Sequence, residues 1–111
     1  MNRLELEWET FDFYSIRIHD QENLHLSKLG LIQSFLNKEY NFSDSKKKEL
    51  LTDYYICCDQ LLVLYKKQMD SISNLIKLNR DFVDIPIERE VDSDTLNNLK
   101  SVTGTLMAEI L

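Results

Sequence analysis

The longest regular pattern of apolar residues lies in the middle of the chain, between Lys46 and Asp81. Apolar residues recur there at intervals of three and four, which is the period of one face of an α-helix. Neither Gly nor Pro interrupts this segment, and the capping residues Ser43 to Ser45 precede it. We therefore predict one amphipathic helix over residues 45–81. Its apolar stripe consists of Leu51, Tyr54, Cys58, Leu61, Tyr65, Ile72 and Leu75.

This central helix needs packing partners on more than one side. The stretch from Tyr54 to Tyr65 is apolar almost all round. At 1.5 Å per residue the helix would be ~50 Å long, which equals or exceeds the diameter of a compact domain of this size. We expect it either to protrude and pair with another chain, or to break within residues 70–74, where poor helix formers cluster.

The N-terminal residues 3–40 fit two interpretations. As a helix, they place Leu4, Trp8, Phe11 and Ile18 on one stripe with Tyr14 at its edge. As strands, the first residues alternate apolar and polar side chains, but no Asn-Gly or Asp-Gly turn separates two strands. We favour the helix, with a break near residues 19–22 where Asp20 could cap a fresh start. The alternative is an α+β fold with an N-terminal strand pair.

The C-terminal part begins with an extended connector over residues 82–92, which contains the single Pro of the chain, Pro86. A capping cluster at residues 92–94 then starts a helix over residues 93–111. Its last turn is apolar, so we expect the turn to dock against the rest of the protein or the chain to have been cut there.

The low content of turn-forming residues decides the fold class. Two Gly and one Pro in 111 residues are too few for a sheet of many short strands. The chain is therefore predicted to form one domain over residues 1–111. We expect an all-α, elongated hairpin or bundle of three to four helices with coiled-coil-like packing.

The charge of the chain narrows the classes of partner. A net charge of -6 repels phosphate backbones and anionic lipid surfaces, so nucleic-acid binding is disfavoured. No apolar run is long enough to span a membrane, and the acidic N-terminus does not resemble a secretory signal. We expect an intracellular protein of the cytoplasm or the nucleus, without a membrane partner.

Residues with catalytic or metal-binding chemistry are few. Cys57 and Cys58 are adjacent on a helix and cannot form a disulfide with each other, so we interpret them as buried free thiols. His19 and His25 lack the spacing of a metal-binding pair. The basic run that starts at Lys46 is typical of a solvated surface. We predict no enzymatic activity, no cofactor, no metal and no small-molecule substrate.

The excess of apolar surface favours a non-catalytic interaction module, a subunit of a homo- or hetero-oligomeric assembly whose partner is another protein chain. The alternative is a small acidic monomeric inhibitor, similar to immunity proteins or antitoxins, that blocks a basic partner. The aromatic stripe near the N-terminus fits either core packing or an anchor for a partner. The predicted partner-binding residues are Trp8, Phe11, Tyr14, Tyr54, Cys58, Leu61, Tyr65, Ile72, Leu106 and Ile110.

Overall fold

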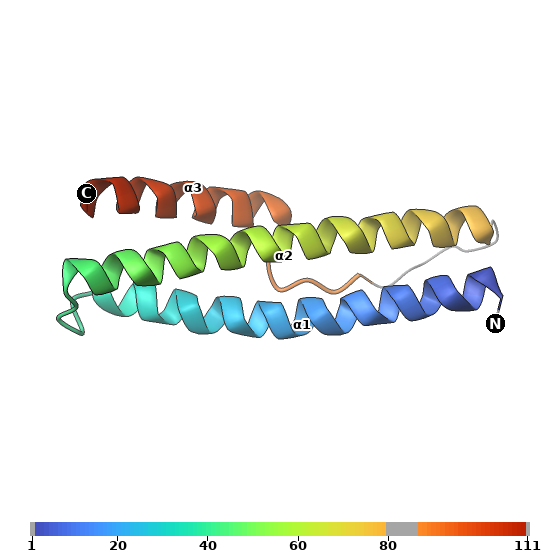
Figure 1. The fold of residues 1–111 in the computed structure, drawn as a ribbon, viewed down its shortest axis with the longest axis horizontal. Helices are drawn as coiled ribbons and strands as arrows, with labels where there is room; N and C mark the ends of the chain where they lie inside the picture. The colour runs from blue at the N-terminus through green and yellow to red at the C-terminus, as the bar shows by residue number, and fades with distance from the viewer. Residues whose placement is uncertain (1, 80–86, 111) are drawn as a thin grey trace.

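The computed structural model describes residues 2–79 and 87–110, and these residues form three helices (Figure 1). Helix α1 (Arg3–Leu36) and helix α2 (Asp44–Leu78) form an antiparallel hairpin, and α3 (Ser93–Ile110) folds back along α2. The molecule measures 55 × 19 × 19 Å. The prediction of an elongated all-α hairpin is confirmed, and no strand occurs in the described residues.

Helix α1 begins where the Asn2 side chain accepts a 2.8 Å hydrogen bond from the backbone N–H of Glu5. It continues through residues 19–22 without the predicted break. Asp20, which suggested the break as a capping residue, is exposed, whereas the nearby Glu22 and His25 are buried and bond to hydroxyl groups of α2. These polar residues therefore belong to the helix–helix contact and do not interrupt the helix.

Helix α1 ends at Leu36, before the predicted limit at residue 40. Lys38 follows with φ 59°, in the left-handed region, and the N–H of Glu39 bonds to the carbonyl of Ser34 at 2.9 Å. This closure satisfies a carbonyl that the end of the helix leaves free and turns the chain toward α2.

Helix α2 is capped by Ser43, whose hydroxyl accepts a 3.1 Å hydrogen bond from the N–H of Lys46. It runs unbroken through residues 70–74. The length of the predicted helix allowed either a break or a second chain as its partner. In the structure α1, of nearly the same length, lies along α2 instead, and Ser71 and Asn74 both bond to Glu7 of α1.

Helix α3 packs against the first half of α2 (Figure 1). Lys100 forms a 2.6 Å ion pair with Asp59, and Gly104 lies close to the ring of Tyr55. Leu96 is fully buried, and the last turn of α3 packs onto the core through side chains that include Ile110. The predicted connector lies partly outside the described residues; its part from 87 to 92 is described and is not helical.

Candidate interaction surface

The apolar stripe that the sequence suggested for partner binding lies inside the protein. Tyr54, Cys58, Leu61 and Tyr65 are at most 1% exposed, and they belong to the core cluster that α1, α2 and α3 share. Ile72 is buried in a second cluster with side chains of α1. These residues are covered by the same chain and present no surface to a partner.

The other predicted partner-binding residues also pack mainly within the chain. Phe11 is buried, and Trp8 packs edge-on against it with ring centroids 5.7 Å apart. Tyr14 is half-buried. Leu106 and Ile110 are half-buried and pack against the main core.

A buried polar network joins α1, α2 and the connector. The hydroxyl of Tyr65 donates a 2.7 Å hydrogen bond to the carboxylate of Glu22, which also accepts from the backbone N–H of Glu90. The Arg89 guanidinium lies 4.1 Å from the centre of the Tyr65 ring. His25 Nε2 and the Tyr54 hydroxyl share a 2.8 Å hydrogen bond nearby. The network satisfies groups that would be costly to bury alone, and it attaches the connector to the hairpin.

Burial shifts the titration of several core groups. Burial lowers the pKa of His25 by more than the nearby Glu22 raises it, so the imidazole is neutral at pH 7. It raises the pKa of the Cys58 thiol to about 11 and also raises that of Cys57. Both cysteines therefore stay protonated near neutral pH and are weak nucleophiles.

No group of three or more metal-binding side chains comes together among residues 2–79 and 87–110. Within the same residues, no helix has the length and apolar character needed to cross a membrane.

A line of exposed apolar side chains runs along the outer side of α1. Leu6, Phe13, Leu24 and Leu31 are 54%, 54%, 44% and 43% exposed. Separations of 7, 18 and 25 residues are close to whole helical turns, so these side chains form one straight line. We call the full line the α1 seam. It consists of Leu6, Thr10, Phe13, Arg17, Asp20, Leu24, Ser27 and Leu31.

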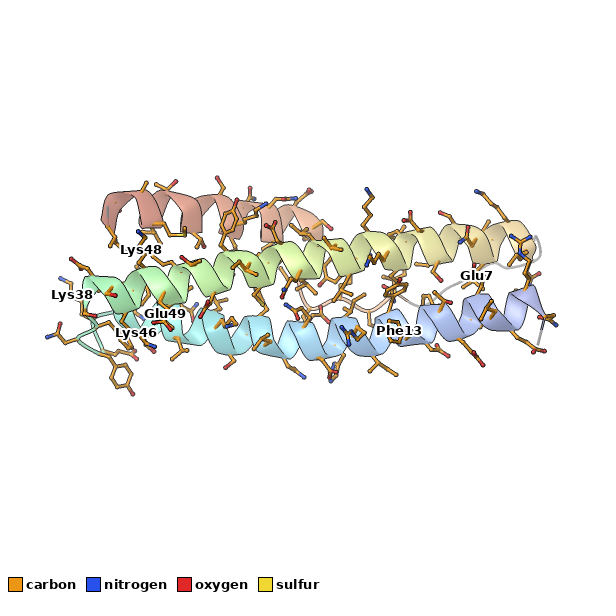
Figure 2. All side chains as sticks on the ribbon, viewed as in Figure 1. Glu7, Phe13, Lys38, Lys46, Lys48 and Glu49 are labelled. Atoms are coloured by element: carbon orange, nitrogen blue, oxygen red, sulfur yellow. The ribbon has the colours of Figure 1, made fainter. Side chains whose placement is uncertain are left out.

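Charged side chains lie toward both ends of the hairpin (Figure 2). Lys38, Lys46 and Lys48 lie at the turn between α1 and α2, and Glu7 lies near the opposite end of the hairpin. Lys46 pairs with Glu49 at 3.7 Å. Phe13 is on α1 in the Glu7 half of the molecule, and the Arg17 guanidinium lies 5.6 Å from its ring centre.

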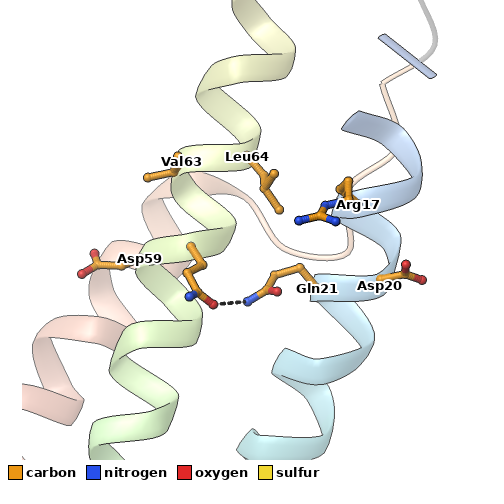
Figure 3. Close-up of a pocket in the computed structure, with 7 residues that line it drawn as sticks. Arg17, Asp20, Gln21, Asp59, Val63 and Leu64 are labelled. Atoms are coloured by element: carbon orange, nitrogen blue, oxygen red, sulfur yellow. Dashed lines mark hydrogen bonds between the residues drawn. The ribbon is translucent and has the colours of Figure 1, made fainter. Parts of the chain in front are cut away.

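An open cleft of about 460 Å³ borders the middle of the α1 seam, between α1 and α2 (Figure 3). The Arg17 side chain points toward α2 in this cleft, and Asp20 points away from α2. A 3.2 Å hydrogen bond from Gln21 to Gln60 crosses between the two helices. Arg17 and Asp20 thus make the middle of the seam charged, whereas its large side chains toward both ends are apolar.

No protein-family model, curated protein or solved structure matches this chain. The sequence interpretation also missed the α1 seam. The signal was present, because residues 6 to 31 alternate intervals of four and three along this line. The competing stripe through Leu4, Trp8, Phe11 and Ile18 has similar spacing, and that stripe faces α2.

Proposed function

We propose that this protein is a non-catalytic helical interaction module, which binds another protein chain through the α1 seam as a subunit of an assembly. The observation that carries the proposal is the line of four large apolar side chains, each 43% exposed or more, on one helix face. Isolated exposed apolar residues are normal, but an aligned series marks a surface where a second helix can pack.

The size of the seam suits a helical partner. From Leu6 to Leu31 it spans 25 residues, which is ~37 Å of helix at 1.5 Å per residue. Alternating intervals of four and three residues are those at which side chains of one helix interlock with those of another. The coiled-coil-like packing expected from the sequence would then form between chains.

Site-specific photo-crosslinking in the native cells tests this proposal. A photoreactive residue placed at Phe13 or at Leu24 is expected to form adducts with protein. The same residue placed at Ile16 or Leu26 serves as the matched control, since both are exposed apolar positions of α1 outside the seam. Adducts from the seam positions alone support the proposal.

Equal yields from seam and control positions, or none from either, would contradict it. A strongly basic protein captured at the seam by an otherwise monomeric chain would point to the inhibitor that the sequence allowed as an alternative.

A further inference from the structure

The α1 seam is self-complementary when it is read in reverse. Its midpoint lies between Ile18 and His19, and residues at equal distances on the two sides match in chemistry. The matching pairs are Leu6 with Leu31, Thr10 with Ser27, Phe13 with Leu24, and Arg17 with Asp20. Apolar residues match apolar residues, hydroxyl groups match hydroxyl groups, and the central cation matches the central anion.

We infer that the partner at the seam is a second copy of this chain, with its α1 antiparallel to the first and a two-fold axis passing near Ile18 and His19. This inference rests on the proposed function and names the partner. A two-fold interface brings each residue of a matching pair opposite its counterpart from the other copy. The reversed seam then gives continuous layers of matched side chains.

The charged middle of the seam selects this arrangement over a parallel one. In the antiparallel dimer each Arg17 lies at the level of Asp20 from the other copy. The exposed Arg17 side chain turns out of the cleft between α1 and α2 to reach this Asp20, and the contact forms twice. A parallel, in-register pairing would place Arg17 beside Arg17 and Asp20 beside Asp20, which is repulsive. Neither residue takes part in an ion pair within the described part of the chain.

The area of the seam sets the expected strength of association. A strip ~37 Å long and about 10 Å wide, the diameter of a helix, is smaller than the ~800 Å² per partner of a standard interface. The dimer is therefore expected to be weak, with a Kd on the order of micromolar to hundreds of micromolar. It should dissociate on dilution, and its formation should depend on ionic strength.

A complementation experiment with two charge reversals tests this geometry. Arg17→Asp makes the middle of the seam wholly negative, and Asp20→Arg makes it wholly positive. Each variant alone is expected to remain monomeric in sedimentation equilibrium at concentrations where the wild type dimerises. An equimolar mixture of the two should dimerise at least as well as the wild type, because both contacts then pair opposite charges.

Matched controls separate this effect from a general change of charge. Asp12→Arg matches Asp20→Arg and changes an exposed position of α1 outside the seam. Lys66→Asp matches the change from positive to negative in Arg17→Asp and lies at an exposed position of α2. Both are expected to dimerise like the wild type. Circular dichroism of every variant checks that the helical fold is retained.

The outcomes distinguish this inference from the proposed function. Dimerisation in the mixture but in neither single variant supports the antiparallel homodimer. A wild type that stays monomeric up to about 1 mM, or single variants that dimerise unchanged, overturns it. Crosslinks from the seam to a different protein would then leave the proposed function standing, whereas absent seam crosslinks would remove both.

Discussion

The two halves of the hairpin are built differently although α1 and α2 run through both. In the half near the turn, formed by residues 18–36, 44–65 and 93–110, α3 covers α2 and one large apolar cluster fills the interior. In the open half, formed by residues 3–17 and 66–78, the cluster consists of Phe11, Ile72 and Leu75, with Leu4 and Trp8 packed on it. The same pair of helices is thus stabilised by a three-helix core at one end and by a two-helix contact at the other.

The open half replaces part of the missing apolar core with polar contacts. Gln68 donates a 2.9 Å hydrogen bond to Ser15, and Ser71 and Asn74 bond to Glu7. Each such bond contributes only ~1 kcal/mol net, less than a fully buried Leu or Phe. We conclude that stability decreases from the turn toward the open end, where local opening should need the least free energy.

A matched pair of cavity substitutions gives the largest expected effect on this comparison. Leu61 and Leu75 are both fully buried, one in each half. Leu61→Ala should reduce the free energy of unfolding by ~4–5 kcal/mol and Leu75→Ala by ~2–3 kcal/mol, since the cost depends on how far the surroundings can collapse. Urea unfolding followed by circular dichroism measures both. Equal losses would mean that the two cores are equally rigid.

The boundary between the halves lies at Tyr65, where α3 no longer covers α2 and the described part of the connector, through Arg89 and Glu90, contacts the hairpin. Tyr65→Phe removes the hydroxyl that donates to Glu22 and leaves this buried carboxylate with the N–H of Glu90. We expect a loss of ~2 kcal/mol in the free energy of unfolding, within the range for the loss of one hydrogen bond to a charged group. Hydrogen exchange should speed up most at the connector and in the neighbouring turn of α1. A uniform change along the chain would contradict this boundary.

The sequence predicted the features that depend on the spacing of apolar residues within one helix. The features that depend on which helices pack against each other could not be predicted from that spacing. The spacing from Leu51 to Leu75 predicted the stripe of α2, and its length and its apolar character near Tyr54 required more than one covering element. The predicted break near Asp20 was wrong because the nearby polar residues Glu22 and His25 bond to Tyr65 and Tyr54 of α2, which lie 43 and 29 residues away in the chain.

The face of α1 that binds α2 was not decidable from its spacing alone. Both the line through Leu4, Trp8 and Phe11 and the line through Leu6 and Phe13 have helical periods. The structure places the first line against α2 and leaves the second line exposed. Nothing in a single helix says how many neighbours it has, so an inner and an outer apolar face look alike in the sequence.

The pH dependence of stability should reveal the buried imidazole of the three-helix half. The folded-state pKa of His25 lies below its unfolded value near 6.5, so folding favours the neutral ring. Stability is then full above the unfolded pKa and is lost as the pH falls below it toward the folded pKa. The urea midpoint of the wild type should decrease between pH 7 and pH 5. His25→Gln should flatten this dependence, while His19→Gln, at an exposed position, should leave it unchanged.

The smallest expected effect lies at the turn, and it would increase the contrast between the halves by stabilising the stronger one. Lys38 has φ 59°, a conformation that costs a residue with a Cβ ~1–2 kcal/mol and costs glycine nothing. The greater freedom of glycine in the unfolded chain offsets part of this gain, so Lys38→Gly should add about 0.5 kcal/mol and raise Tm by roughly 2–4 °C. Lys38→Ala removes the same charge but keeps the Cβ, and it should give no gain. An equal rise in both variants would instead assign the effect to relief of repulsion among Lys38, Lys46 and Lys48, which lie together at this end of the molecule.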